Sequence, residues 1–170
     1  MPLSLKDFID LCDQGTSQEI CDAVRMGIAV DESDEQGWTA LMLAAGSLDA
    51  PELIELLLDA GSDVHARDRS GRTPLMHAAW NNESTAVIHT LVDRGANLNA
   101  QDNQGRTPLM YAAEKNRNPD VLAALIKRGA DMGIKNISGL TALMCCKSQG
   151  KDAAVNLLIE AELKIKEFEE

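Results

Sequence analysis

The amino-acid sequence predicts an all-α solenoid of stacked repeats, because one short motif returns along the chain at a fixed interval. The motif reads GRTPLMHAAW from Gly71 and GRTPLMYAAE from Gly105, with weaker copies, GWTALMLAAG and GLTALMCCKS, from Gly37 and Gly139. Its threonines are spaced 34 residues apart, at Thr39, Thr73, Thr107 and Thr141. The residues of a catalytic site do not recur at a fixed interval. Such a repeat is typical of proteins built from stacked structural units, each of which contacts mainly its neighbours.

The composition agrees with a stack of short helices and excludes some classes of partner. Hydrophobic residues make up 45% of the 170-residue chain but aromatic residues only 3%, so alanine and leucine must fill the interior. The formal net charge of −11 would repel a phosphate backbone, and we therefore expect no nucleic-acid partner. No run of eighteen or more apolar residues exists and the first twenty residues do not resemble a signal peptide, so we expect no membrane association.

The first helix of a unit is clearest in the copy that begins near Asp68. Thr73 followed by Pro74 is typical of a helix start, because the hydroxyl can accept a free backbone N–H of the first turn and proline is tolerated there. Leu75, Ala78 and Ala79 then share one face, and small alanines allow another helix to approach closely. The pattern predicts a helix of about two turns.

A second helix should follow after the polar break NNE. Ser84 is placed to cap it, and apolar side chains from Val87 to Val92 recur at helical spacing. Gly95 should end the helix, because glycine adopts a left-handed conformation most easily. The next ten residues, ANLNAQDNQG, are rich in turn formers and predict a projecting turn. We call this turn, which joins each unit to the next, the finger.

These residues resemble the ankyrin repeat, whose signature has a D-x-x-G-x-T-P-L start, a small AA pair and G-A-D-V-N-A after the second helix. The matching stretches are DEQGWTALMLAA, DRSGRTPLMHAA and DNQGRTPLMYAA, with GSDVHA, GANLNA and GADMGI after the second helices. The resemblance covers roughly residues 6 to 162 and implies one ankyrin-repeat domain over 1–170. Its expected parts are an N-terminal capping repeat at 6–33, inner repeats at 34–67, 68–101 and 102–135, a C-terminal capping repeat at 136–162, and a polar tail at 163–170.

Two departures from the family pattern stand out. The inner repeats carry one extra residue between their helices, with Pro51 and Pro119 at equivalent positions starting the second helix, and this resembles bacterial ankyrin proteins. In the second departure, methionine stands where the family commonly has a histidine that holds the loop by hydrogen bonds. The methionines are Met42, Met76, Met110 and Met144. We expect a thioether not to form such a bond, which leaves packing or other polar groups to hold the loop.

No residues form a catalytic or metal-binding pattern, so we predict neither an enzyme nor a cofactor. The sequence lacks an HExxH motif, a G-x-S-x-G elbow and a G-x-G-x-x-G fingerprint. His65, His77 and His89 fall in a turn, a first helix and a second helix, where they should not converge on one metal ion. Cys12, Cys21, Cys145 and Cys146 form no CxxC pair and are interpreted as free thiols in a reducing compartment. We therefore expect a cytoplasmic location, with export as an effector as the alternative.

The resemblance implies a binding surface, because ankyrin proteins usually bind partners on the concave side made by the fingers and the first helices. Both tryptophans and the only tyrosine of the chain fall at positions of this surface, together with several cations. Such side chains often anchor protein interfaces. The predicted partner-binding residues are Trp38, Arg69, Arg72, His77, Trp80, Asn81, Asn103, Arg106, Tyr111, Lys115 and Leu140.

The function predicted from these observations is non-catalytic protein binding through the concave groove, by a monomer. The cations of the groove suit a protein partner with an acidic or aromatic patch. Two alternatives remain open at this point: a regulatory or targeting domain of a larger protein, and a scaffold that associates with itself. Ordinary core packing is the competing interpretation of the aromatic residues, and it predicts that Trp38 and Trp80 are buried.

Overall fold

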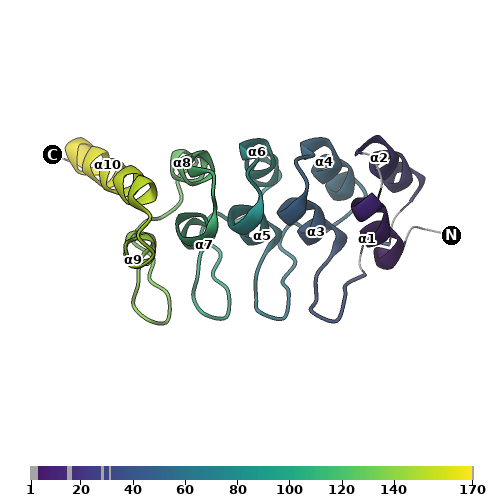
Figure 1. Cartoon of the computed structure of the whole chain (residues 1–170), viewed down its shortest axis with the longest axis horizontal. Coiled ribbons are helices and arrows are strands. Elements are labelled where there is room, and N and C mark those ends of the chain that lie inside the picture. Colours follow the sequence, from purple (N-terminus) through teal and green to yellow (C-terminus); the bar gives the residue numbers. More distant parts are fainter. Residues whose placement is uncertain (1–3, 15–16, 28, 31, 170) are drawn as a thin grey trace.

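The computed structural model describes residues 4–14, 17–27, 29–30 and 32–169, and within them the chain forms ten helices. The helices lie in two rows with the chain ends at opposite ends of the molecule, and the fingers project from the row of first helices (Figure 1). The first helices are α1 (Leu5–Gln14), α3 (Ala40–Ser47), α5 (Pro74–Asn81), α7 (Pro108–Lys115) and α9 (Ala142–Ser148). The second helices are α2 (Ser17–Met26), α4 (Pro51–Asp59), α6 (Thr85–Asp93), α8 (Pro119–Lys127) and α10 (Asp152–Glu169).

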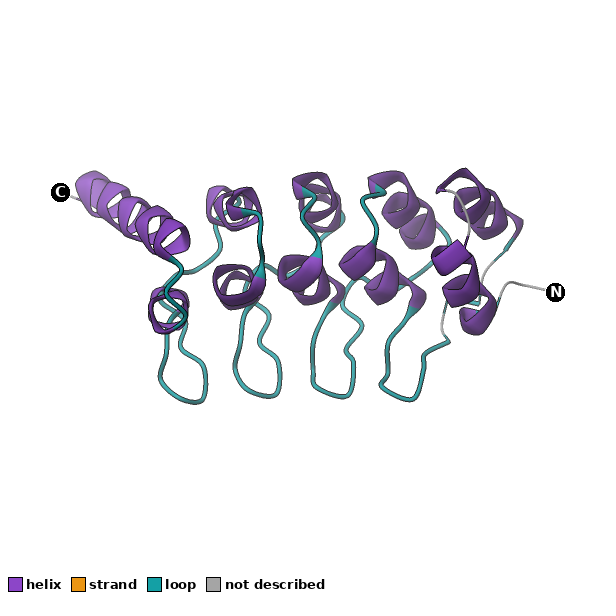
Figure 2. Ribbon diagram, in the orientation of Figure 1, coloured by secondary structure: helices purple, strands orange, loops and turns teal. Residues whose placement is uncertain are grey.

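This arrangement confirms the predicted all-α solenoid. Helices and loops account for the described chain (Figure 2), and its β pairing is limited to one isolated bridge between Ser33 and Thr39. The stretch expected as a polar tail is helical as far as the described residues reach, because α10 continues to Glu169.

The helix starts follow the sequence signals closely. Each motif threonine precedes a first helix in extended backbone conformation, and its hydroxyl accepts an N–H from the residue three positions later; for Thr73 that donor is Met76, at 3.4 Å. Pro51 and Pro119 begin α4 and α8, as expected. Ser84 does occupy the N-cap of α6, but its side chain makes no capping hydrogen bond, so this expectation was only half right.

The core runs as a continuous band along the contacts between successive first helices. The alanine pairs of α3, α5 and α7 are at most 3% exposed, and the leucine that starts each pattern, such as Leu75, is fully buried. Small side chains at these positions allow neighbouring helices to pack at short distance. The second helices cover the band with Leu57, Leu91 and Leu125, all of which are fully buried.

The fingers are joined to one another by backbone hydrogen bonds. Arg69 donates its N–H to the carbonyl of Gln36 at 2.9 Å, Asn103 to Ser70 at 3.0 Å, and Ile137 to Gln104 at 3.0 Å. The fingers lie so close that a Cβ at Gly71, which has a φ of +79°, would come within 2.5 Å of the Asn103 side chain. Glycine is therefore required there for space as well as for its backbone conformation.

Inside each of the four fingers, an aspartate or asparagine side chain holds the turn by accepting two backbone N–H groups. Oδ1 of Asp68 accepts the N–H groups of Ser70 at 2.8 Å and Arg72 at 2.9 Å. Equivalent bonds are made by Asp34, Asp102 and Asn136. The expectation that a thioether forms no hydrogen bond is wrong at Met76, whose Sδ accepts the N–H of Thr73 at 3.4 Å.

Buried asparagines join successive units near the loops between their two helices. Nδ2 of Asn82 donates to the carbonyls of Ala45 and Leu48, and Nδ2 of Asn116 donates to those of Ala79 and Asn82, at 2.8 to 2.9 Å. One side chain thus satisfies two carbonyls of the preceding unit, one in the last turn of its first helix and one in the loop that follows. In the last unit Lys151 ends the series, because its Nζ donates to the carbonyl of Asn116 at 2.9 Å.

The thiols of Cys21, Cys145 and Cys146 are free, as predicted. The side chain of Cys12 lies outside the part of the chain that the structure describes. Burial is the main cause that raises the pKa of Cys145 and Cys146 above the usual range of thiols, which favours packing over reactivity at these two positions.

Replacement of Asn116 by alanine should lower the free energy of unfolding by about 1 to 3 kcal/mol, because the carbonyls of Ala79 and Asn82 lose their donor. Urea denaturation followed by far-UV circular dichroism measures the change. Asn156, exposed on α10, is the matched control, and its alanine variant should unfold at the parental midpoint. Equal midpoints for both variants would show that the asparagine series adds nothing to stability.

Candidate functional site

An aromatic row crosses the first helices on the side of the fingers. The ring of Trp38 meets that of His77 edge to face at 4.6 Å, and the ring of Trp80 stacks on that of Tyr111 at 5.4 Å. The guanidinium of Arg72 lies 5.7 Å from the ring centre of Trp38 and 5.1 Å from that of Trp80. A cation within about 6 Å of a ring face is attracted by the ring. Arg72 therefore connects the two halves of the row.

The repeat itself places these side chains together. Trp38, Arg72 and Arg106 hold the same position in successive units, immediately before the capping threonine, so their side chains are neighbours across unit boundaries. Gly46 stands where the next unit has Trp80, and the missing side chain leaves a hollow of about 270 Å³ between α3 and α5. Trp38, Trp80 and His77 are among its walls.

A buried carboxylate supports the row from below. Oδ2 of Asp68 accepts from Nε of Arg72 at 2.7 Å, and Nε2 of His77 lies 3.1 Å from the same oxygen. Burial acts to raise the pKa of Asp68, but the hydrogen bonds and charge of Arg72 outweigh it and hold that pKa below its usual value. The carboxylate is therefore ionised and can only accept, so Nε2 of His77 carries the proton.

Burial acts to raise the pKa of Asp68 but lowers that of His77, because it disfavours the charged form of an imidazole. Burial, and then the charge of Arg72, lower the pKa of His77, and they outweigh the attraction of Asp68. His77 is thus a neutral donor at neutral pH, locked between Asp68 and the ring of Trp38.

The following unit repeats this arrangement with a different donor. The hydroxyl of Tyr111, at the position equivalent to His77, donates to Oδ2 of Asp102 at 2.6 Å. Burial and this hydrogen bond raise the pKa of Tyr111 well above its usual value. The Arg106 guanidinium lies over the ring of Tyr111 at 5.3 Å and pairs with Glu114.

Most of the predicted site residues do reach this surface. Trp38 and Trp80 are half-buried, which matches the expectation that they are partly exposed and argues against complete core packing. Arg72 and Arg106 are also half-buried. The exposed members are Arg69, Asn81, Asn103, Lys115 and Leu140.

Two of the predicted contact residues offer little surface. His77 and Tyr111 are each only 5% exposed, because their polar atoms turn inward to Asp68 and Asp102. They line the two hollows and support the shape of the row, and their contact with a partner stays a prediction. The sequence prediction also omitted Asp68 and Asp102, although both follow the same 34-residue spacing as the threonines and could have been found by it.

A second hollow of about 440 Å³ continues the row toward the next unit. Its lining includes Arg69, Asn103, Arg106, Tyr111 and Lys115. In the described part of the chain, the structure shows ion pairs for Arg106 and Lys115, both with Glu114, but none for Arg69. This hollow is therefore more polar and more cationic at its rim than the one beside Trp38.

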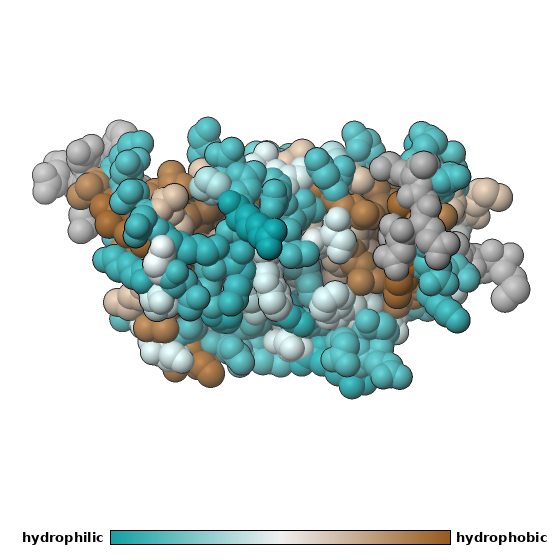
Figure 3. Space-filling view, in the orientation of Figure 1, coloured by the Kyte–Doolittle hydropathy of each residue, from teal (hydrophilic) through white to brown (hydrophobic). Residues whose placement is uncertain are grey.

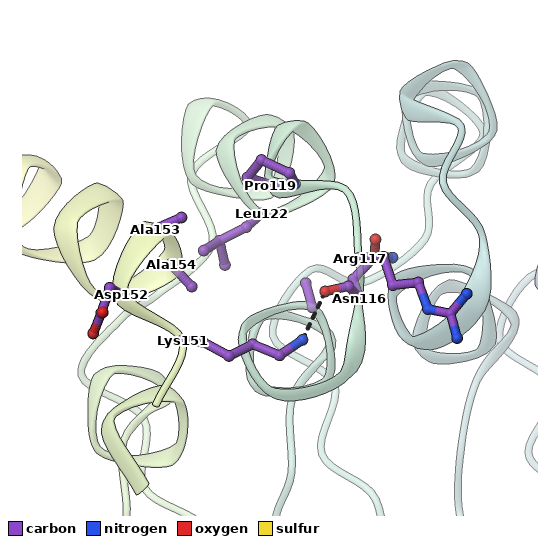
Figure 4. Close-up of a pocket in the computed structure, with 9 residues that line it drawn as sticks. Asn116, Arg117, Pro119, Leu122, Lys151, Asp152, Ala153 and Ala154 are labelled. Carbon is purple, nitrogen blue, oxygen red and sulfur yellow. Dashed lines mark hydrogen bonds between the residues drawn. The ribbon is translucent and has the colours of Figure 1, made fainter. Parts of the chain in front are cut away.

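A third hollow, of about 330 Å³, lies between α8 and α10, away from the fingers. Figure 4 shows Lys151 reaching across it toward Asn116, with Arg117 farther along the same loop. Its apolar floor includes Leu122 and Ala154. The loop before α10 is as long as the equivalent loops of the inner units, whereas α9, with 7 residues, is one residue shorter than α7.

Among the described residues, no three potential metal-binding side chains of histidine, cysteine, aspartate or glutamate come together. Within the same part of the chain, no helix is both long enough and apolar enough to cross a membrane.

The family comparison agrees with this geometry. A family model described as ankyrin repeats (3 copies) matches residues 47–136, which is more than half of the chain. A comparison with curated proteins found no similar sequence.

The lowered pKa of His77 predicts a loss of stability in mild acid. A group whose pKa is lower in the folded than in the unfolded state stabilises the protein above its unfolded pKa, and this contribution is lost as the pH falls toward the folded pKa. Urea unfolding is measured at about pH 7.5 and about pH 5, which lie above and below the usual histidine pKa of about 6.5. The free energy of unfolding of the parent should be smaller at the lower pH, and the decrease should be less in His77→Gln. His89→Gln, which removes a histidine outside this cluster, should keep the parental decrease, and identical decreases in all three proteins would contradict the assignment to His77.

Proposed function

The chain belongs to the ankyrin-repeat family, and from this premise we propose that it binds a protein partner, without catalysis, through the groove formed by its fingers and first helices. Proteins built from these repeats generally act as protein-interaction modules. The observation that carries the proposal for this chain is the half-exposed pair Trp38 and Trp80 on either side of the Arg72 guanidinium. Tryptophan and arginine are the side chains that most often dominate binding energy at protein interfaces.

The surface is suited to binding because it is ordered before any partner arrives. Asp68 holds Arg72 and His77 from below, Asp102 holds Tyr111, and the finger hydrogen bonds align successive units. A surface held in this way loses little conformational entropy when a partner binds.

The charges indicate which chemistry a partner should bring. Arg72 and Arg106 are already paired with Asp68 and Glu114, so they offer their planar faces more than their charge. Arg69 is exposed at the rim of the second hollow, and the described residues show no ion pair for it. Lys115 is also exposed there and contacts Glu114 at 3.3 Å, but a pair this exposed is weak enough for a partner's carboxylate to compete with it. We infer a partner segment that places an apolar or aromatic side chain against Trp38 and Trp80 and one or more carboxylates near Arg69 and Lys115.

The double variant Arg69→Glu with Lys115→Glu tests this proposal, because it reverses two exposed rim charges. Among the described residues, only Lys115 of the two has an ion pair, with Glu114. Proteins cross-linked to the parent in a lysate of the source cells would be quantified by mass spectrometry against those captured by the variant. The genuine partner should be reduced about tenfold or more, since like charges facing each other oppose association. Helical circular dichroism and the melting temperature should stay close to the parental values.

A charge-matched control separates a specific site from general repulsion. Arg117→Glu with Lys127→Glu makes the same change in charge at two exposed positions, one in the loop before α8 and one at the end of α8, outside the lining of both groove hollows. Partner capture should be unaffected by this control. The captured partner should also reduce acrylamide quenching in Trp38→Phe and Trp80→Phe, each of which keeps one tryptophan. Equal capture by both double variants, or no shielding of either tryptophan, would place the partner elsewhere on the molecule.

A further inference from the structure

The hollow between α3 and α5 lies where the repeat omits a side chain that the next unit supplies. In the next unit the ring of Trp80 stacks on that of Tyr111, with centres 5.4 Å apart and planes 18° apart. At the equivalent positions 34 residues earlier the chain has Gly46 and His77. The place that an aromatic side chain of the protein fills in one unit is therefore left open in the unit before it.

The walls of this hollow are suited to a further aromatic ring. Trp38 stands at the position that Arg72 holds beside Trp80 in the next unit. His77 stands at the position of Tyr111. A ring placed here would meet one ring from each of two units, in the stacked or edge-to-face contacts that aromatic pairs favour.

The hollow is large enough for such a ring, and it is open because residue 46 has no side chain. Its volume of about 270 Å³ exceeds the roughly 150 Å³ that is enough for benzene. Gly46 lies within α3 and lacks the left-handed conformation that requires glycine at Gly71. A Cβ on Gly46 would lie 3.6 Å from the Cβ and the carbonyl oxygen of His77, which is an ordinary contact. Neither backbone conformation nor close packing therefore explains this glycine, and its effect is to keep the hollow open.

The charges around the hollow favour a neutral occupant. Among the described side chains that line it, only His77 can carry a charge, and it is neutral at neutral pH. The guanidinium of Arg72 already lies 5.7 Å from the ring centre of Trp38 and 5.1 Å from that of Trp80, so it would repel a second cation beside the same rings. A carboxylate would lose its water against walls that are largely apolar, and it finds the exposed Arg69 in the neighbouring hollow instead.

The surroundings of the hollow are polar. Most of the finger surface in the space-filling view is hydrophilic, with apolar residues at the tip of the last finger (Figure 3). At the rim, Ser47 and Asn81 are exposed, and Nδ2 of Asn81 donates to the carbonyl of Gly46 at 3.2 Å. An apolar hollow with a polar rim suits one inserted side chain better than a broad apolar contact.

We propose that this hollow binds one neutral aromatic side chain of the partner, a phenylalanine, tyrosine or tryptophan, in the place that a side chain at position 46 would fill. The inserted ring would meet Trp38 and His77, as the ring of Trp80 meets its own neighbours in the next unit. Carboxylates on the same partner segment would reach Arg69 in the neighbouring hollow, which complements the charge of that rim. The site rests on the proposed function only for the source of the ring, because the hollow belongs to the chain itself.

Phenol titrated into the whole chain tests the site by NMR. The chain has two tryptophans, Trp38 and Trp80, and both line the hollow, so each of the two indole N–H signals reports on it. Phenol should shift both signals along a saturating curve, with a dissociation constant in the millimolar range that suits a ligand of this size. Trp38→Phe and Trp80→Phe assign the two signals.

Two further compounds separate the classes of occupant. Cyclohexanol matches phenol in size but lacks a planar π system, so its dissociation constant should be about threefold or more higher. Tetramethylammonium, a cation, should cause no saturable shift, because Arg72 repels it. Cyclohexanol that binds as tightly as phenol, or tetramethylammonium that binds more tightly, would overturn the proposal.

Gly46→Trp fills the hollow from within and should raise the dissociation constant for phenol about tenfold or more. Ser148→Trp adds the same side chain at the exposed equivalent position of α9 and should bind phenol like the parent. Circular dichroism and melting temperature establish that each variant is folded. Trp38→Ala, which removes one wall, should weaken phenol binding to a similar extent and provides a second test, read from the signal of Trp80. No saturable shift in the parent, or undiminished binding in both Gly46→Trp and Trp38→Ala, would show that the hollow is not a site for a ring.

Capture of the partner then tests whether its ring uses the hollow. Gly46→Trp should reduce the amount captured about tenfold or more, because the partner's ring loses its place, whereas Ser148→Trp should capture the parental amount. Parental capture by Gly46→Trp would overturn this site and leave the groove proposal unaffected, since Arg69→Glu with Lys115→Glu tests that proposal separately. Phenol binding needs no partner, so it tests the hollow even if the groove proposal fails.

Discussion

The close packing of successive first helices is the interaction on which the rest of this structure depends. Ala78 and Ala79, with their counterparts in the neighbouring units, let the helices approach without a large side chain between them. At that spacing the backbone of one finger reaches the next, as the bond from Arg69 to Gln36 shows, and Asn82 reaches carbonyls of the preceding unit. A larger residue in this band would separate the units and break both series of bonds.

The buried carboxylates connect this scaffold to its surface. Asp68 closes its own finger through Oδ1 and holds Arg72 and His77 through Oδ2, so one side chain serves both the backbone and the aromatic row. A charge in this position is favourable only because several donors meet it. The features that stabilise the finger are thus the same ones that orient the side chains offered to a partner.

The side and the end of the solenoid present different chemistry. The groove side combines half-exposed tryptophans with cations already held in place, which suits recognition of another protein. At the end formed by α9 and α10, Met144 repeats a methionine that the inner units bury, and no further unit covers it among the described residues.

The sequence by itself determined the periodic features of this protein: the 34-residue repeat, the threonine caps, the alanine band and the positions of Trp38 and Trp80. These features follow from residue type and spacing, which can be recognised in the sequence alone. Only the tertiary structure decided which side chains face inward. His77 and Tyr111 occupy nominal surface positions yet are buried, because carboxylates of their own fingers accept their hydrogen bonds, and Met144 looks interior yet is exposed. Burial depends on what the neighbouring unit places against a residue, and a repeat read along the chain does not contain that information.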